Sequence, residues 1–579
     1  MRNKSRILSS LVLSVGLISS VMASVPTVDM KPLSESLNVS SLKGQVKNGS
    51  SMPQITWAED MRTILANGNS QTTKKGSLFD EAALTFNLEL SDSFVNQSKN
   101  YISGKSPFFR GTMDQVVQLN ETVYKDPDLR PVVLNILSWS QGGDSLVVSE
   151  KIKNIKDLKG KRIAAMAYGP HVFFVSRTLK SAGLTFNDVE MIWVKDLVGT
   201  ESTSVRAFCD STLNVDAAFT ISTEAFSVIE GDNSCKGAHE MFSTKQASKV
   251  IADVIAVRSD YFNAHKDELS KFVHTQMIAK EKADVVFADK NSTDYKEWIS
   301  ASAKILFGDS SLIEDAEGMF ELDAAHLGYS ENALFFNDQI GGRNFKSLTS
   351  EINDSLIDMK LINTRYPLAQ ANWDWSKFQA GLKYSQSVAT PAFDSAQTKR
   401  IVNQMQANNT LDSEQFLTEE IKFDVGESTF SFNPVYHAAI FNKIIDESLT
   451  YSNTLVLIQA HSDPSHYLIE KYKYNKPESE LKRIRQKAWN LSVERAKEVR
   501  QEIIDYALKE RGISLDESQF EFIGYGFEKP LTGICGNEPC KINLKGQAAK
   551  EAYGSNRRAV IGFTRISAEK DISADEFDF

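Results

Sequence analysis

The chain has 579 residues, which is too long for one hydrophobic core and indicates two to four domains. Hydrophobic residues make up 41% of the sequence and charged residues 24%, which is typical of globular proteins and excludes a disordered or fibrous chain. The formal net charge is −10, and this acidic balance argues against nucleic acid or an anionic lipid surface as a general partner.

The first 23 residues have the pattern of a secretory signal peptide. Arg2, Lys4 and Arg6 precede an apolar stretch at 7–22, and Ala23 supplies a small residue at the cleavage point. The alternative is an uncleaved anchor, but about 16 apolar residues rich in Ser and Gly are short for a span that needs roughly 20. We therefore expect an exported protein in the periplasm.

Residues 24–50 are rich in Ser and lack sustained periodicity, so we expect a flexible lead-in. From residue 51, short apolar strands alternate with helical segments, which predicts a parallel-rich α/β sheet with covered faces. Residues 259–380 are expected to be mainly helical. The expected strands lie at 54–57, 84–90, 131–137, 161–166, 189–194, 215–220 and 250–257.

The pattern changes in the last third of the chain. Residues 385–415 are polar and contain Pro391, so we expect an interdomain linker there. Residues 416–567 predict a compact α+β domain in the order β-α-β-α-β, with a first strand at 423–426 and a long helix that ends near Arg511. The tail at 568–579 is acidic and is expected to be disordered.

Four cysteines form two near pairs, Cys209 with Cys235 and Cys535 with Cys540. In an oxidising compartment, such pairs favour disulfides. A zinc site is the alternative interpretation, but no CxxC motif or paired histidines accompany them. We expect two disulfides, no metal site and no cofactor.

Several polar and aromatic residues lie where expected strands end, which is where open α/β sheets bind ligands. The segment SWSQGGD at 138–144 follows one strand, and YGPH at 168–171 precedes a helix whose free N–H groups could hold an anion. The alternative is that the tryptophans are core residues and the glycine pair is a turn. Their joint placement predicts a shared cleft with the candidates Trp57, Trp139, Ser140, Gly142, Gly143, Asp144, His171, Thr220 and Glu224.

The stretch GGDSLVVSEKIKNIKDLKGKRIAAMAYGPHVFFVSRTLKSAGL at 142–184 resembles the solute-binding proteins of ABC importers of the nitrate/sulfonate/taurine type. The resemblance implies a type 2 periplasmic binding protein over residues 51–384, with two α/β lobes and a small molecule between them. Asp144 and Glu224 favour an amine, whereas the helix at His171 favours an anion, so the charge of the solute stays open. The implied partner is an ABC permease or a membrane sensor.

Two opposite charges stand out in the C-terminal domain. Asp463 follows the expected strand TLVLIQAH, and Arg495 lies one turn into a helix that begins near Leu491. A carboxylate and a guanidinium on neighbouring rims can hold a zwitterion. Alternatively, the two residues pair with each other, or Arg495 lines a solvated helix face.

Four ordered segments, IQAHSDP, LSVERAKEVRQEII, GYGFEKP and SNRRAVIGF, resemble the OmpA-like peptidoglycan-binding domain. The resemblance implies that Asp463 and Arg495 bind the diaminopimelate of the stem peptide, and that Asn556 and Arg557 support the pocket rim. Two features depart from the family. Ala488 stands where an Asn is usual, and the segment 464–487 is longer than the usual connection.

Together these features predict a non-enzymatic periplasmic solute-binding protein that is tethered to the cell wall through peptidoglycan. An alternative is a structural or sensory docking protein whose large domain no longer binds a transported solute. An enzyme is a third class, but the sequence contains no GxSxG, HExxH or P-loop pattern. We therefore expect no catalytic residues.

Overall fold

The structure is a computed structural model, and it describes residues 24–47, 49, 51–230, 234–337, 342–383, 393–424, 430, 432–532, 534–535, 538–539 and 545–567. The expected signal peptide at 1–23 and acidic tail at 568–579 lie outside the described residues. Cys540 of the second expected disulfide also lies outside them.

The first lobe is built on a mixed sheet in the order β11-β4-β10-β3, with β12 beside β4. The strands are β3 (Phe108–Thr112), β4 (Pro131–Ser140), β10 (Ala252–Arg258), β11 (Ala324–His326) and β12 (Ala369–Gln370). A separate parallel pair consists of β1 (Ser51–Gln54) and β2 (Asn87–Leu90). The main helices are α3 (Ala58–Ala66), α5 (Phe94–Ile102), α6 (Met113–Val123), α11 (Lys266–Phe287), α12 (Thr293–Leu306), α13 (Ile313–Leu322), α14 (Tyr329–Phe335) and α15 (Phe345–Asp358).

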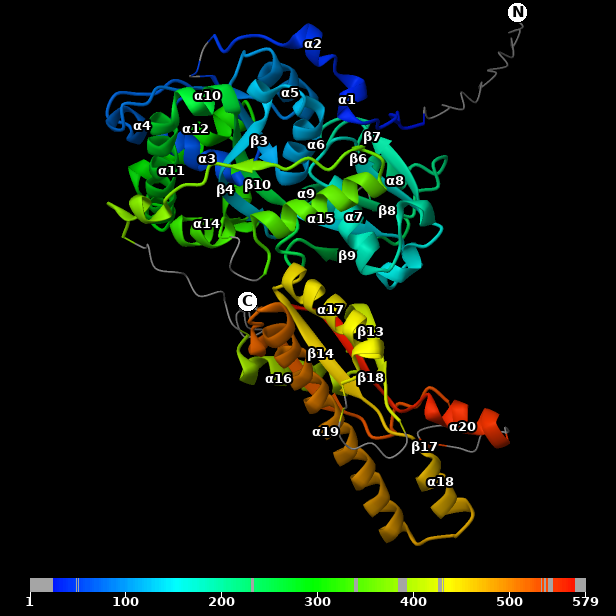
Figure 1. Cartoon of the computed structure of the whole chain (residues 1–579). Helices are drawn as coiled ribbons and strands as arrows, with labels where there is room; N and C mark the ends of the chain where they lie inside the picture. The colour runs from blue at the N-terminus through cyan, green and yellow to red at the C-terminus, as the bar shows by residue number, and fades with distance from the viewer. Residues whose placement is uncertain are drawn as a thin grey trace, which may run out of the picture.

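The second lobe is built on a sheet in the order β7-β6-β8-β5-β9. The strands are β5 (Asp144–Val148), β6 (Arg162–Met166), β7 (Glu190–Val194), β8 (Ala217–Ile221) and β9 (His239–Ser243), and the helices are α7 (Val172–Ser181), α8 (Ser204–Cys209) and α9 (Ser222–Ile229). The chain passes between the two sheets from β4 to β5 and again from β9 to β10. These two crossing segments join the lobes (Figure 1).

The predicted positions of several strands are confirmed, but the prediction of a parallel-rich sheet was wrong. The strands expected at 131–137, 161–166, 189–194 and 250–257 correspond to β4, β6, β7 and β10. However, β10 is antiparallel to both β3 and β4, and β5 is antiparallel to both β8 and β9. A buried apolar run has the same pattern in either direction of pairing, and β3, β5 and β9 were not predicted.

The first expected disulfide is present and lies in the second lobe. Cys209, the last residue of α8, is bonded to Cys235, which follows α9. Within the described ranges, no helix is long and apolar enough to cross a membrane.

Residues 24–47 pack along both lobes, which differs from the expected flexible lead-in. Val28 N donates a hydrogen bond of 2.9 Å to Trp193 O in the second lobe. The segment continues through α1 (Leu33–Ser36) and α2 (Val39–Leu42) onto the first lobe, where Arg258 Nη1 donates to Gly44 O. Leu33 and Leu37 are buried. These apolar side chains anchor a stretch whose Ser-rich composition suggested no order, and we call residues 24–47 the strap.

The C-terminal domain has a four-stranded sheet in the order β13-β18-β14-β15. The strands are β13 (Gln415–Lys422), β14 (Thr454–Ala460), β15 (Phe520–Gly524) and β18 (Arg558–Ser567), and α17 (Pro434–Thr450) and α19 (Glu478–Arg511) pack on one face. Gly512 ends α19 in the left-handed conformation at φ 63°, as glycine does most readily.

Two boundaries of this domain differ from the expected ones. The first strand is β13 at 415–422, so it lies before the segment expected at 423–426. The expected linker at 385–415 contains α16 (Ser395–Ala407), and its Val402 packs with Leu455 and Leu457 of β14. The helix therefore covers the second face of the sheet, although only Ile401, Val402 and Met405 form its apolar stripe in a polar segment.

The C-terminal domain docks on the two-lobe part through a buried polar contact. Arg177 Nη2 in α7 lies 2.9 Å from Glu447 Oε2 in α17, and both side chains are 2% exposed. Ser181 Oγ donates to the same carboxylate at 2.8 Å. Beside this contact, the ring of Phe242 in β9 stacks on Phe416 in β13 with centroids 5.0 Å apart. Figure 1 shows β9 of the second lobe next to α17.

Candidate functional site

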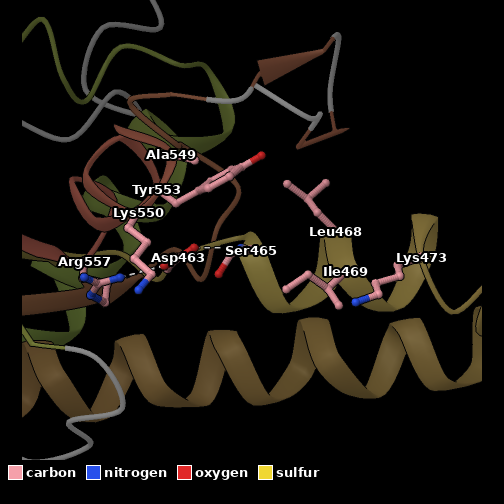
Figure 2. A pocket seen from close by; sticks show the side chains of 9 residues that line it. All are labelled: Asp463, Ser465, Leu468, Ile469, Lys473, Ala549, Lys550, Tyr553 and Arg557. Atoms are coloured by element: carbon pink, nitrogen blue, oxygen red, sulfur yellow. Dashed lines mark hydrogen bonds and ion pairs between the residues drawn. The ribbon is translucent and has the colours of Figure 1, made fainter. Parts of the chain in front are cut away.

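A cavity of about 570 Å³ lies beyond the end of β14 in the C-terminal domain (Figure 2). Its base is formed by Asp463, Ser465 and Arg557. One wall comes from α18 (Ser465–Tyr472) and the residue after it, with Leu468, Ile469 and Lys473. The other wall comes from α20 (Gly546–Gly554), with Ala549, Lys550 and Tyr553. The volume falls in the range of small-ligand sites, about 300–1,000 Å³.

Asp463 is held in place by the two buried residues that precede it. His461 N donates to Arg558 O at 2.8 Å, and Ser462 N donates to Gly526 O at 2.6 Å. Asp463 Oδ1 accepts a hydrogen bond from Ser465 N at 2.7 Å at the start of α18. The carboxylate therefore emerges at the strand end, as the sequence predicts.

The ion-pair partner of Asp463 is Arg557. Arg557 Nη1 lies 2.7 Å from Asp463 Oδ2, and the side chains are 16% and 17% exposed (Figure 2). Arg557 Nε also donates to Phe423 O at 3.3 Å, which orients the guanidinium. Both charges line the cavity, so a zwitterion can exchange this internal pair for two pairs of its own.

Arg495 has a different position from the expected clamp. Its side chain is 1% exposed, because Ser492, Arg495, Ala496 and Val499 form the face of α19 that turns toward the sheet. Arg495 Nη1 donates to His461 O at 3.4 Å, and its guanidinium carbon lies 4.8 Å from the ring centre of Phe423. The guanidinium thus lies beneath the strand end that presents Asp463, and the predicted position of Arg495 on a rim beside Asp463 was wrong.

The neighbours of Arg557 in the NRR motif contact the protein itself. Asn556 is fully buried, and its Oδ1 accepts a hydrogen bond from Leu531 N at 2.6 Å. Arg558 Nη2 donates to Lys529 O at 3.4 Å. The sequence motif therefore supplies one cavity residue, Arg557, and two residues that hold neighbouring segments.

In the two-lobe part, the structure brings together the side chains of three predicted cleft residues, Ser140, Asp144 and His171, at the crossing segments. Ser140 Oγ donates to Asp144 Oδ2 at 2.6 Å, and His171 Nε2 lies 2.6 Å from Asp144 Oδ1. Thr244, which sequence reasoning missed, lies 2.8 Å from Ser140 Oγ and accepts from Gly142 N and Asp144 N. It follows β9, a strand that was not predicted. All four side chains are buried.

Trp57 joins a second polar chain that sequence reasoning missed. Trp57 Nε1 donates to Ser138 Oγ at 3.2 Å, and Ser138 Oγ donates to Asp253 Oδ2 at 3.1 Å. Arg110 Nη1 lies 2.9 Å from Asp253 Oδ1, and Arg110 Nη2 lies 2.9 Å from Asp60 Oδ2. Burial raises the pKa of Asp60 to about 7, although Arg110 opposes this. These hydrogen bonds and ion pairs therefore connect Trp57 to a buried ionic cluster.

The remaining cleft candidates have ordinary surroundings. Trp139 is 3% exposed and packs edge-on against Phe335, so it is a core residue, as the alternative interpretation held. Thr220 is fully buried in β8. Glu224 lies in the first turn of α9, and partial burial raises the pKa of its carboxyl. A side chain at Gly143 would approach the ring of Trp57 to 2.6 Å, so the two lobes meet closely there.

The N-terminus of α7, where the sequence favours an anion, receives a carboxylate of the protein itself. Asp114 in α6 accepts a hydrogen bond from Thr112 Oγ1, and the nearby backbone N–H of Phe173 in α7 acts to lower the pKa of its carboxyl. Burial raises the pKa of Asp114 to about 6. Gln115 Nε2 donates to Tyr168 O at 2.9 Å beside it. Both contacts join the first lobe to the second.

Residues 132–283 match the protein family described as NMT1/THI5 like. This segment contains β4 to β10 and therefore includes strands of both lobes and both crossing segments. Two lobes joined in this way are the architecture that the sequence resemblance implied. No curated protein is similar to this chain.

Several solved structures have similar chains. The periplasmic aliphatic sulphonate binding protein SsuA from Escherichia coli is 13% identical with a TM-score of 0.37, and the match covers 59% of this chain and 98% of that one. The alkanesulfonate-binding protein SsuA from Xanthomonas axonopodis pv. citri, bound to MOPS, is 13% identical with a TM-score of 0.36, covering 55% and 96%. The desulfurization enzyme DSZB is 14% identical with a TM-score of 0.32, covering 57% and 96%.

Proposed function

We propose that the protein is a periplasmic solute-binding protein that is tethered to peptidoglycan by its C-terminal domain. The observation that carries the tether is the Asp463–Arg557 pair, which lines an open cavity with opposite charges. The far end of a diaminopimelate side chain bears an ammonium and a carboxylate on one carbon. Asp463 binds the ammonium and Arg557 donates to the carboxylate.

Arg495 supports this site from below. Its contact with His461 O stabilises the strand end that presents Asp463, and its positive charge lies behind the base of the cavity. The OmpA-like resemblance of the surrounding segments agrees with this use of the domain. A periplasmic location follows from the signal-peptide pattern and from the peptidoglycan ligand.

The two lobes hold a small solute, and an ABC permease or a membrane sensor receives it. The NMT1/THI5-like segment and the two crossing segments support this part of the proposal. Attachment to the cell wall keeps the lobes at one depth in the periplasm, which raises their effective concentration near a membrane partner.

One set of contacts favours the alternative, a cell-wall-anchored docking or sensory protein. Asp114 occupies the N-terminus of α7, and the strap runs across both lobes. Trp57 lies against Gly143. In this arrangement several polar groups between the lobes pair with one another, as Asp144 does with Ser140 and His171.

The tether is tested by co-sedimentation of the full chain with purified diaminopimelate-type peptidoglycan. We expect Asp463→Asn and Arg557→Gln each to weaken binding by roughly 2–5 kcal/mol, because one charge of the ligand stays unpaired. Arg500→Gln is the matched control, since Arg500 contacts Glu517 and Phe520 O away from the cavity. Undiminished sedimentation of both cavity variants would rule out the tether.

Solute binding is tested separately by thermal unfolding of the full chain with amines, sulfonates and phosphate. A ligand at a hundred times its Kd stabilises a protein by about 2.7 kcal/mol, which gives a measurable rise in Tm. A rise with one compound class supports the solute-binding function. The absence of any rise across the screen favours the docking alternative.

A further inference from the structure

We infer that the C-terminal cavity has a second subsite, built by α18 and α20, which binds another free carboxylate of the stem peptide. This inference rests on the proposed peptidoglycan function. The Asp463–Arg557 pair lies at one end of the residues drawn in Figure 2, and Lys473 lies at the other end. The cavity of about 570 Å³ therefore continues beyond the ion pair that holds a zwitterion.

The charges of the lining exceed what a zwitterion needs. Asp463 and Arg557 balance each other, which leaves Lys473 and Lys550 as two further positive charges. Across the part of the chain that the structure describes, neither lysine has a carboxylate within ion-pair distance. The acidic neighbours have other contacts: Glu470 lies 3.8 Å from His466, and Glu551 accepts from Gln547 at 3.0 Å. The two lysines favour a ligand with extra negative charge.

The surface between the two ends is apolar. Ile469 is 46% exposed, and Leu468 and Ala549 also line the cavity between the ion pair and Lys473. Tyr553 faces them from α20 (Figure 2). Apolar walls between charged ends fit an aliphatic peptide segment with a carboxylate at its far end.

The α18 segment is packed firmly against the rest of the domain. Tyr467 is fully buried and packs against Phe527 with ring centroids 5.1 Å apart. Leu481 at the start of α19 belongs to the same buried cluster, and the guanidinium carbon of Arg485 lies 4.9 Å from the ring centre of Tyr467. The longer connection at 464–487 thus places Ile469 and Lys473 at fixed positions, so it can contribute to specificity.

The occupant is the acidic residue that precedes diaminopimelate in the stem peptide. Its α-carboxyl group is negative when free and neutral when amidated, while the rest of the peptide is the same. The subsite therefore distinguishes free from amidated stem peptides, and this difference isolates the role of the lysines from that of the Asp463–Arg557 pair.

The test uses the full chain and two synthetic tripeptides, L-alanyl-γ-D-glutamyl-diaminopimelate with a free or an amidated glutamyl α-carboxyl group. By calorimetry, we expect the wild type to bind the free form about tenfold more tightly, as charge-assisted hydrogen bonds provide. The double variant Lys473→Gln, Lys550→Gln should bind the two peptides equally. Its affinity for both should equal the affinity of the wild type for the amidated peptide. Lys482→Gln, an exposed charge on α19 outside the cavity, should keep the preference.

Three results would overturn the inference. Equal affinity of the wild type for both peptides would show that the carboxylate is not recognised. A preference that persists in the double variant would assign it to other residues. If the wild type binds neither peptide, the proposed tether fails together with the subsite. If the wild type binds both peptides equally and Asp463→Asn loses both, the tether stands and only the lysine subsite fails.

Discussion

Replacing Glu447 by Gln removes one charge from the contact between the C-terminal domain and the second lobe while keeping the shape of the side chain. Glu447 Oε2 lies 2.9 Å from Arg177 Nη2 and accepts from Ser181 Oγ at 2.8 Å. Breaking a buried ion pair costs about 3–5 kcal/mol, because the remaining charge stays in a medium of low dielectric. Arg177 keeps Glu351 at 3.2 Å, so we expect a smaller loss of stability, at or just below the lower limit of this range, about 2–3 kcal/mol.

The assay is urea unfolding of the full chain, followed by tryptophan fluorescence and by circular dichroism. The variant should lose stability and should unfold with separate transitions for its two parts, because the contact that couples them is weakened. Glu419→Gln is the control, since Glu419 faces Lys156 across the same interface at 3.6 Å, and Lys156 is 46% exposed. A surface pair of this kind contributes about 0–1 kcal/mol.

A double-mutant cycle sharpens this prediction. Arg177→Met combined with Glu447→Leu should destabilise by less than the sum of the two single changes, with a coupling of at least about 1 kcal/mol. If Glu447→Gln loses no more stability than Glu419→Gln, or if the cycle shows no coupling, the docked arrangement of the C-terminal domain is refuted.

Two further predictions concern the lobes. Burial and the nearby Asp144 carboxylate raise the pKa of Asp323 to about 7 from its ordinary 3.8, so the folded state binds the extra proton and stability falls as the pH rises from about 4 to 7. Asp323→Asn cannot ionise, so it should avoid this loss of unfolding free energy, which is at most about 4 kcal/mol. The Tm of the variant should equal that of the wild type near pH 4 and exceed it by the largest amount above pH 7. A difference in Tm that does not depend on pH would contradict this prediction. Leu33→Ala should weaken the packing of the strap on the first lobe by about 2–5 kcal/mol, because Leu33 is buried, and should make residues 24–47 sensitive to protease. If these residues stay as resistant to protease as in the wild type, this prediction is contradicted.

The positions of many elements could be read from the sequence, because they depend on local patterns. The apolar runs of β4, β6 and β10 and the amphipathic α7 lie where periodicity places them. The cysteine spacing indicated the disulfide between Cys209 and Cys235. Two ordered sets of motifs separated a large α/β part from a small α+β part, and they identified Asp463 as a residue at a strand end.

The sequence did not reveal the order in the strap or in α16. Both segments carry their apolar residues among many polar ones, and their order depends on surfaces that other parts of the chain supply. Leu33 is buried at the first lobe, and Val402 is buried against β14. Composition describes only the segment itself, so a short segment that packs on a distant surface has the composition of a flexible one.

The sequence by itself determined which kinds of charge the C-terminal domain carries, and the tertiary structure decided which of them meet. Arg495 and Arg557 were both candidates, but the rotation of α19 turns Arg495 inward, while the turn before β18 brings Arg557 to within 2.7 Å of Asp463 across 94 residues. In the same way, the path of the chain places Asp114 at α7 and Glu447 beside Arg177. Such pairs depend on how distant elements pack, and a local pattern contains no information about that packing.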